Sequence, residues 1–184
     1  MKKIIIISII IFPALVWAAY KPARILAPEL VPGITCKSDT ICLDDISRYH
    51  EAVTLYNEAL VFVESTVGVI KEEPKVLFCS TQSCFKSFGF NKASAKTIGT
   101  SGIVISPKGW KYYYLRHEMI HHLQAEKMGV ISLLLRPDWF TEGMAYSLSE
   151  DPREKLSTPH QAYREKFSVW YKAVQKENLW EASL

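Results

Sequence analysis

The longest helical pattern of apolar residues lies between positions 44 and 66. Apolar side chains recur there every three or four residues, a spacing that places them on one face of an α-helix. They are Ile46, Tyr49, Val53, Tyr56, Leu60 and Val63. Asp44 and Asp45 can cap the start of this helix, and Gly68 follows its end. We therefore predict a helix from these two aspartates to about Thr66.

Two short apolar runs predict strands. They are residues 75–79 (Lys-Val-Leu-Phe-Cys) and residues 102–106 (Gly-Ile-Val-Ile-Ser), and each has a proline at one boundary. Residues 80–102 are rich in Ser, Thr, Lys and Gly and predict loops or an irregular hairpin. Residues 20–41 contain three prolines and show little periodicity, so they predict an extended lead-in held by a disulfide at Cys36.

The second half of the chain predicts three helices around a short apolar run. The helices extend from Lys111 to about Met128, followed by Gly129; from about Trp139 to Ser149, opened by Pro137-Asp138; and from about Pro159 to Asn178, capped by Thr158. A helix, a few strands and then several helices predict an α+β fold. A chain of 184 residues suffices for one ordinary domain and is too short for two.

The N-terminus predicts export. Lys2-Lys3 precede an apolar run from Ile4 to Val16, and Val16-Trp17-Ala18 offers small residues near a cleavage point. A cut after Ala19 fits almost as well. We therefore assign residues 1–19 to a signal peptide and residues 20–184 to the mature domain.

An uncleaved membrane anchor is the alternative at the N-terminus. The apolar run from Ile4 to Ala19 has 16 residues, and Pro13 interrupts it. A spanning helix needs about 20 apolar residues, so cleavage is favoured. With either outcome the folded part is delivered outside the cytoplasm, to the periplasm or the medium.

The cysteines agree with export. Four cysteines allow three pairings, and their closeness predicts the local disulfides Cys36–Cys42 and Cys79–Cys84. A zinc knuckle made from all four is the rival interpretation, but gaps of five and four residues differ from the usual two. The formal charge of +3 falls by two, to +1, once Lys2-Lys3 are removed. Composition thus gives no basis for binding nucleic acid or an anionic membrane, and we expect a monomer.

The segment Leu115–Leu123 (Leu-Arg-His-Glu-Met-Ile-His-His-Leu) carries the candidate chemistry. His117 and His121 lie four residues apart, so on a helix both imidazoles leave one face, one turn apart. Two such nitrogens can meet one tetrahedral zinc at about 2.0–2.1 Å. Glu118 lies about 100° further around the helix, where it can reach a zinc-bound water without binding the metal. His122 points off this face and is expected to pack or to lie at the surface.

The alternative for this motif is a pair of surface histidines beside a glutamate, with no role in metal binding. The motif's context argues against it, because the remaining helix faces carry apolar residues that can bury the helix. We therefore predict a metal site with Glu118 as the general base.

A second segment resembles a known family. Trp139-Phe140-Thr141-Glu142-Gly143-Met144-Ala145 is similar to the "Trp-hydrophobic-x-Glu-Gly-x-Ala" glutamate helix of gluzincin peptidases, and residues 124–129 lack the third histidine of metzincins. The resemblance covers about residues 100–150 and is to small, single-domain gluzincins. It implies that Glu142 is the third zinc ligand, and that residues 102–106 form the edge strand that binds extended substrate. Gly143 is expected to let the two site helices approach closely.

The chain departs from this family at Tyr146. Thermolysin-like members carry at that position an aspartate that orients a zinc-bound histidine. Tyr146 is a candidate for an equivalent hydrogen bond, for a transition-state donor or simply for packing. His160 and Tyr163 are weaker candidates for oxyanion stabilisation.

These observations together predict an exported zinc endopeptidase that acts on a peptide or protein substrate. The expected fold is an α+β, zincin-like metallopeptidase domain with a short, mostly antiparallel sheet, an active-site helix and a glutamate helix. Three alternatives remain open. They are a non-catalytic, zinc-stabilised binding protein on a degenerate peptidase fold, a latent enzyme with a covered cleft, and a zinc amidase acting on envelope polymers.

Overall fold

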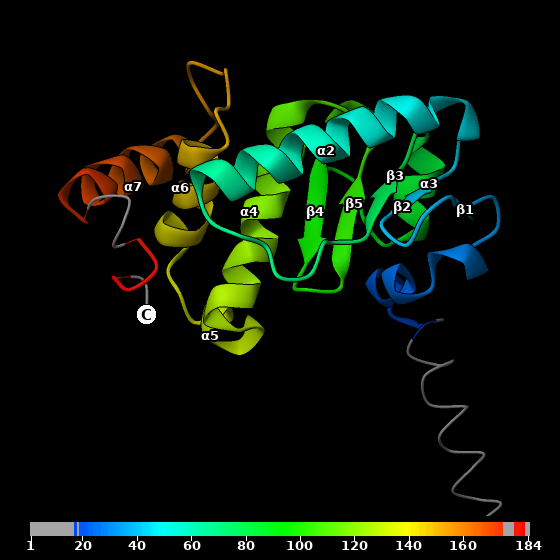
Figure 1. Cartoon of the computed structure of the whole chain (residues 1–184), viewed down its shortest axis with the longest axis horizontal. Helices are drawn as coiled ribbons and strands as arrows, with labels where there is room; N and C mark the ends of the chain where they lie inside the picture. Colours follow the sequence, from blue (N-terminus) through cyan, green and yellow to red (C-terminus); the bar gives the residue numbers. More distant parts are fainter. Residues whose placement is uncertain (1–16, 18, 175–178, 183–184) are drawn as a thin grey trace, which may run out of the picture.

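The computed structural model describes residue 17, residues 19–174 and residues 179–182. It is an α+β structure in which helices pack against a five-stranded mixed sheet (Figure 1). Most of the predicted signal peptide and residues 175–178 of the predicted last helix lie outside the described residues. In the part of the chain that the structure describes, no helix has the length and apolar content needed to cross a membrane.

The sheet has the strand order β1-β2-β3-β5-β4. Its strands are β1 Thr35–Cys36, β2 Ile41–Leu43, β3 Val76–Phe78, β4 Ala95–Ile98 and β5 Gly102–Ile105. The pairs β2/β3 and β3/β5 are parallel, whereas β1/β2 and β4/β5 are antiparallel. The prediction of a mostly antiparallel sheet was therefore wrong. β2 and β3 are parallel because the long helix between them forms a crossover that returns the chain in the same direction.

The four predicted long helices are present, close to their expected bounds. They are α2 Tyr49–Thr66, α4 Tyr112–Met128, α6 Asp138–Leu148 and α7 His160–Val174. Gly129 ends α4 with a φ of 79°, a conformation that glycine adopts without strain. The apolar run after it forms the short helix α5, Val130–Leu134.

Two stretches expected to lack helices contain short ones. The predicted extended lead-in holds the 3₁₀ helices η1 Lys21–Leu26 and η2 Pro28–Leu30, and two further 3₁₀ turns precede α2 and α4: η3 Ile46–Arg48 and η4 Pro107–Gly109. The predicted loop region contains α3, Gln82–Ser87, which Thr81 caps by accepting a hydrogen bond from the backbone N–H of Cys84. Helices of this length show no sequence period, so the composition of the region dominated the prediction.

The edge strand was also misassigned. β5 lies inside the sheet between β3 and β4, and all four of its residues are buried. The edge is β4, whose Lys96 is exposed and whose Thr97 is half-buried. A strand buried on both faces reads as a continuous apolar run, whereas an edge strand near a site carries polar residues.

Alternate residues of the central strands feed two apolar cores. On β3, Val76 and Phe78 join the larger core, together with residues of α2, α4, α6 and α7. Leu77 points the other way, into a smaller core with residues of η1 and α3. The larger core is thus the base on which the candidate site helices rest.

Candidate metal centre

Helix α4 places two imidazoles together on one face. Nε2 of His117 and Nε2 of His121 lie 3.1 Å apart. The helix is buried along most of its length, with Leu115, Met119 and Ile120 in the larger core. Because these apolar residues fix the rotation of α4, the two histidines are held toward the opposite side.

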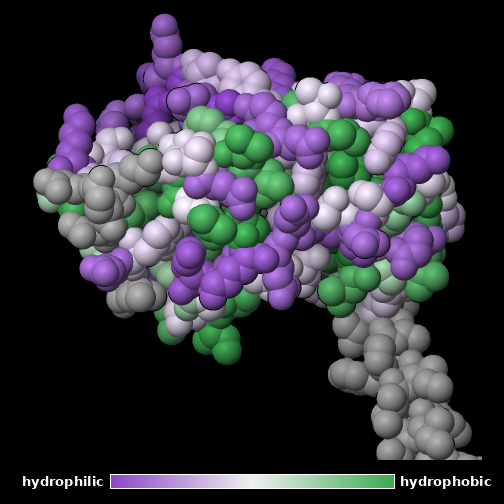
Figure 2. All heavy atoms as spheres, in the orientation of Figure 1, coloured by the Kyte–Doolittle hydropathy of each residue, from purple (hydrophilic) through white to green (hydrophobic). Residues whose placement is uncertain are grey.

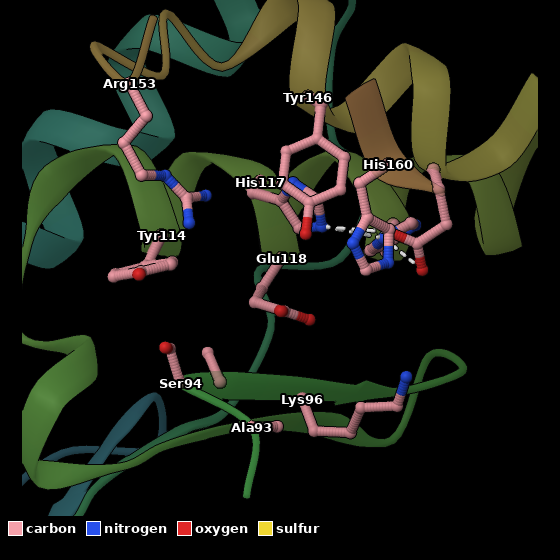
Figure 3. Close-up of a pocket in the computed structure, with 12 residues that line it drawn as sticks. Ala93, Ser94, Lys96, Tyr114, His117, Glu118, Tyr146, Arg153 and His160 are labelled. Carbon is pink, nitrogen blue, oxygen red and sulfur yellow. Dashed lines mark hydrogen bonds and ion pairs between the residues drawn. The ribbon is translucent and has the colours of Figure 1, made fainter. Parts of the chain in front are cut away.

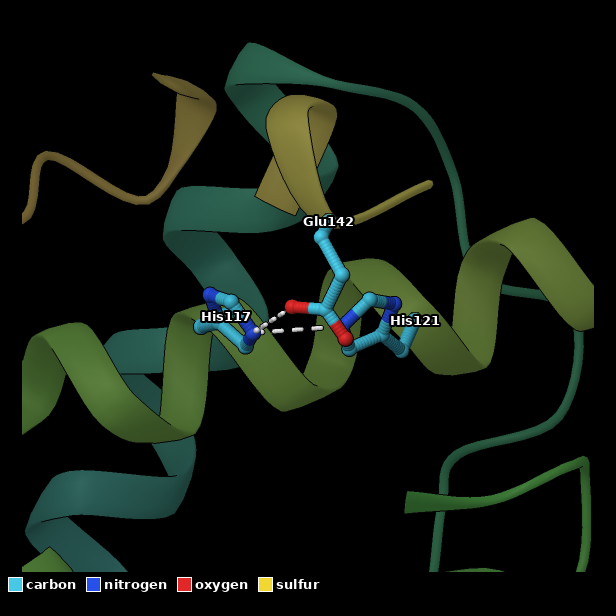
Figure 4. A group of neighbouring side chains, drawn as sticks. All are labelled: His117, His121 and Glu142. Atoms are coloured by element: carbon cyan, nitrogen blue, oxygen red, sulfur yellow. Dashed lines mark hydrogen bonds and ion pairs between the residues drawn. The ribbon is translucent and has the colours of Figure 1, made fainter. Parts of the chain in front are cut away.

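Helix α6 brings Glu142 to the two histidines, as Figure 4 shows. One carboxylate oxygen lies 3.5 Å from Nε2 of His117 and the other lies 3.6 Å from Nε2 of His121. Ligand atoms from all three residues lie within 4.8 Å of one another, so this group can hold a metal ion.

The spacing of these atoms fits a small tetrahedral cation. Two ligands at about 2.0–2.1 Å from a tetrahedral metal stand about 3.3 Å apart. The two imidazole nitrogens, 3.1 Å apart, are close to that spacing, and they lie 3.5 and 3.6 Å from the two different oxygens of Glu142. The donor set, two imidazole nitrogens and one carboxylate oxygen, leaves one position of a tetrahedron open.

Gly143 positions Glu142 by a contact that the sequence did not indicate. A Cβ atom at Gly143 would lie 2.5 Å from the backbone oxygen of Tyr163 and 2.7 Å from Cβ of Phe167. Gly143 therefore lets α6 approach α7, where a close approach to the histidine helix was expected. Tyr163 takes part through this backbone contact and does not line the cleft described below.

Gln124 fixes the orientation and tautomer of His121. The side-chain Nε2 of Gln124 donates to the backbone oxygen of Thr141 at 2.9 Å, so its Oε1 is left as an acceptor. That oxygen lies 2.8 Å from Nδ1 of His121, which must therefore carry the proton. In the neutral ring, Nε2 of His121 therefore carries the lone pair that can bind a metal. Gln124 is fully buried and also ties α4 to the residue before Glu142.

Two of the ligand candidates, His121 and Glu142, have shifted pKa values. Burial lowers the pKa of His121, but interaction with Glu142 outweighs burial, and the net pKa is raised above 6.5. Burial raises the pKa of Glu142, yet contact with His117 and His121 outweighs it and leaves that pKa far below its ordinary value. In the metal-free protein, a proton on His121 can thus supply the positive charge beside Glu142 that a bound cation would supply.

Glu118 lies beside the cluster and is held by the edge strand. Its Oε2 accepts a hydrogen bond of 2.7 Å from the hydroxyl of Thr97 on β4, and its backbone oxygen lies 2.9 Å from the same hydroxyl. The Glu118 side chain is buried and lines the cleft in front of the histidines (Figure 3). This contact gives the carboxylate a fixed position without making it a member of the ligand group.

Tyr146 packs against the cluster as a protonated phenol. Its ring centre lies 4.3 Å from that of His117 and 5.1 Å from that of His160. Burial, and then the negative charge of Glu142, raises the pKa of Tyr146 to about 12. Its hydroxyl therefore remains a hydrogen-bond donor at neutral pH, and it points into the cleft in Figure 3.

A cleft runs along β4 and past the candidate ligands on both sides. One half has a volume of about 250 Å³ and is lined by Ser94, Tyr114, Tyr146, Arg153 and His160. The other half measures about 330 Å³ and is lined by Thr97, Gly99, Val130, Leu133, Leu134, Arg136, Asp138 and Thr141. Both halves share Lys96, Glu118, His121 and Glu142. The ligand group thus lies between the half that carries Arg153 and His160, called the polar half below, and the half that carries the apolar residues of α5, called the apolar half below.

Helix α5, which lines the apolar half of the cleft, also carries exposed apolar atoms (Figure 2). Ile131, Leu134 and Leu135 are each about four-fifths exposed, at 79%, 80% and 82%. Leu134 also lines the cleft, so this surface lies next to the site.

Sequence reasoning missed Gln124, Thr97 and Arg153. Thr97 and Arg153 reach the site only because the fold brings β4 and the segment after α6 to α4, so no local spacing marks them. Gln124 lies three residues after His121 on the same helix, and that spacing was the one available signal. His122 was assigned correctly, since it is buried away from the cleft with Nε2 2.9 Å from the backbone oxygen of Glu72.

Comparison of the chain with protein-family models, with curated proteins and with solved structures finds no match in any of the three.

Proposed function

We propose that the protein is an exported zinc metallopeptidase of the gluzincin type. The observation that carries this proposal is the convergence of His117, His121 and Glu142 from two helices, with Glu118 beside them in a cleft. Glu118 is the decisive member, because a purely structural metal site has no use for a carboxylate held next to the ligands. The two disulfides support the exported part of the proposal.

Zinc is the metal that suits this donor set best. Two imidazoles and one carboxylate that leave a fourth position open are typical of catalytic zinc sites. Bound there, zinc would lower the pKa of a coordinated water toward about 7 and polarise a substrate carbonyl. The contact between Gln124 and His121 adds the kind of support from outside the ligand group that such sites have.

Glu118 is the proposed general base. The Thr97 hydroxyl occupies one of its oxygens, which leaves the other to take a proton from the attacking water and pass it to the leaving amine. Tyr146 is the proposed donor to the oxygen that gains charge at the scissile carbonyl, because its phenol stays protonated and faces the cleft.

The free edge of β4 is the proposed binding site for an extended substrate backbone. β4 is the last strand of the described sheet, and Lys96 and Thr97 lie along the cleft that contains Glu118. An extended peptide can add to such an edge through main-chain hydrogen bonds. This arrangement favours peptides and proteins over compact small molecules as substrates.

The experiment that tests the proposal compares Glu118→Gln with His117→Ala. Glu118→Gln should keep near-stoichiometric zinc and a near-native melting temperature, while peptide cleavage falls by at least about 10²–10⁴-fold. His117→Ala should lose both zinc and cleavage, together with the stability that bound metal contributes. Metal analysis, thermal unfolding and hydrolysis of an unstructured peptide provide the readouts.

Glu51→Gln is the matched control, because this glutamate of α2 pairs with Arg48 of η3 and does not line the cleft. Cleavage that survives Glu118→Gln unchanged would remove the proposed mechanism. Bound zinc without any hydrolysis would favour a zinc-stabilised binding protein, and hydrolysis of envelope polymers alone would favour an amidase.

A further inference from the structure

Arg153 stands out among the residues that line the polar half of the cleft. Its side chain is 35% exposed, whereas the carboxylate of Asp151, its ion-pair partner, is only 2% exposed. Asp151 therefore lies behind the guanidinium, on the protein side, and it does not line the cleft. A ligand entering this half meets the cation first.

The ion pair fixes the guanidinium and leaves one nitrogen available. Nε of Arg153 donates to both oxygens of Asp151, at 2.8 and 3.0 Å, and Nη2 donates to one of them. Among the described residues, Nη1 has no hydrogen-bond partner. The guanidinium extends into the cleft above Tyr114 in Figure 3.

Aromatic rings hold the guanidinium in place. Its central carbon lies 5.1 Å from the ring centre of Tyr114 and 5.8 Å from that of Tyr146. Tyr114 precedes His117 by one turn of α4, and Tyr146 contacts the His117 ring, so Arg153 is tied to the candidate ligands through both. An arginine fixed on several sides loses little conformational entropy when it binds a ligand.

The charges around Arg153 favour an anion. The carboxylates lining this half are Glu118 and Glu142, which face the metal position, and the bases besides Arg153 and the two candidate ligand histidines are Lys96 and His160. Once a divalent cation occupies the ligand group, the positive charge of this half exceeds its negative charge, even with Asp151 counted. No comparable cation faces the same half from α7, which contributes His160 alone.

We propose that the polar half of the cleft binds a substrate carboxylate through Nη1 of Arg153, which makes the enzyme selective for peptides with an anionic group on that side of the scissile bond. This inference rests on the proposed peptidase function and adds its substrate class. The carboxylate belongs to a part of the substrate near the scissile bond, because Arg153 and the candidate ligands line the same half of the cleft. Its source is either an acidic side chain or the free C-terminus of the substrate.

The test uses peptides that differ only in this carboxylate. One set carries Glu, Gln or Lys near the scissile bond with an amidated C-terminus, and a second set carries Gln with either a free or an amidated C-terminus. Binding to zinc-loaded Glu118→Gln protein is measured by calorimetry, and cleavage by the wild-type protein is measured as kcat/KM. A preference for Glu assigns the carboxylate to a side chain, and a preference for the free end assigns it to the C-terminus.

Removing Arg153 should abolish the preference. Because Arg153→Gln alone leaves Asp151 buried and unpaired, the double variant Asp151→Asn/Arg153→Gln removes both charges together. We expect it to bind and cleave the preferred acidic peptide about 10–100-fold less well, with less than about threefold change for the neutral peptide. Arg48→Gln, at an ion pair outside the cleft, is the matched control and should change neither.

Equal binding of acidic and neutral peptides by the zinc-loaded protein would overturn the inference, whether or not cleavage occurs. Cleavage of neutral peptides would still support the proposed peptidase in that case. Preferential binding of acidic peptides without any cleavage would instead support the carboxylate site and count against the peptidase. Retention of the acidic preference in the double variant would exclude Arg153 as its source.

Discussion

The two faces of the sheet achieve stability by different means. The face that carries α2, α4, α6 and α7 buries a large apolar core in which all four long helices take part. The opposite face buries a smaller cluster under η1 and α3, and both disulfides contribute cysteines to it. A small core supplies little free energy, so covalent cross-links compensate where the helices are short.

The buried polar residues follow the same division. Of the seven buried polar residues in the described part of the chain, five lie on α4, above the large core: Arg116, His117, Glu118, His122 and Gln124. Burying such groups costs free energy unless each finds a partner. The free energy gained by burying a large apolar core can offset that cost. This explains why the candidate chemistry lies on the face without disulfides.

Reduction of the disulfides should give the largest effect on stability and leave the metal site unchanged. Each bridge closes a short loop, so its loss should lower the free energy of unfolding by about 2 kcal/mol. Denaturant unfolding with and without reductant measures this loss, and zinc titration of the reduced, still folded protein measures the site. A large fall in zinc affinity on reduction would show that the two faces are coupled, and it would contradict the view that they are stabilised independently.

Gly143→Ala tests the opposite face. The added Cβ would meet the backbone of Tyr163, which cannot move aside as a side-chain tip can. We expect about 1–3 kcal/mol lower stability together with weaker zinc binding, because α6 must shift and carry Glu142 with it. Gly33→Ala is the contrasting control: unlike Gly143, Gly33 has a positive φ, 85°, but nothing lies within 4 Å of its added Cβ, so it should cost stability and leave zinc affinity unchanged. An equal fall in zinc affinity in both variants would show that the close approach of α6 to α7 does not position Glu142.

Gln124→Leu should weaken zinc binding more than it weakens folding. The change keeps the volume of the side chain but removes the acceptor that fixes the Nδ1 proton of His121. Zinc affinity should fall about 10–100-fold, the usual scale for losing support outside the ligand group. Competition with a chelator measures it. If affinity is unchanged, the tautomer of His121 does not depend on Gln124.

The sequence could predict the parts of the site that depend on local spacing, and it could not predict those that depend on contacts between distant segments. The histidine pair and Glu118 were predictable because their spacing lies within one helix, and the glutamate helix followed from a family resemblance. The bounds of α2 came from apolar periodicity, and those of α4 and α6 came from the glycine, proline and capping residues at their ends, all of which are local signals. Thr97 and Arg153 depend on contacts between distant segments, and so does the order of β4 and β5, since both are short strands that no local period distinguishes.

The stability of the metal-free protein should depend on pH through the same cluster. His121 has a raised pKa, so its contribution is fully present below its ordinary value of 6.5 and is lost as the pH rises through the raised value. Glu142 has a lowered pKa, so its contribution is present above 4.5 and is lost as the pH falls further. The pair therefore stabilises the metal-free fold most between about pH 4.5 and 6.5.

Bound zinc should remove the loss of stability that the metal-free protein shows as the pH rises. A bound metal replaces the imidazole proton, so zinc affinity should rise with pH until the raised pKa of His121 is passed. Melting temperatures measured from pH 4 to 9, with zinc and with a chelator, check both directions. His121→Asn removes the titrating ligand and should flatten the difference between the two curves. Parallel wild-type curves across the whole range would show that this cluster does not exchange a proton for the metal.

Thr97→Val should have the smallest effect, and it separates the roles of Glu118 and of the strand that holds it. Valine keeps the shape of threonine and suits a strand, so folding and zinc content should stay close to wild type. The hydroxyl that donates to Oε2 of Glu118 is lost, and the carboxylate gains freedom to turn away from the water position. One hydrogen bond of this kind is worth about 0.5–1.5 kcal/mol, which predicts a fall in kcat of about 3–10-fold with little change in KM. Thr97→Ser retains the hydroxyl and should restore most of the rate. A rise in KM for Thr97→Val with unchanged kcat would mean that Thr97 serves the substrate-binding edge of β4 and that Glu118 does not need it.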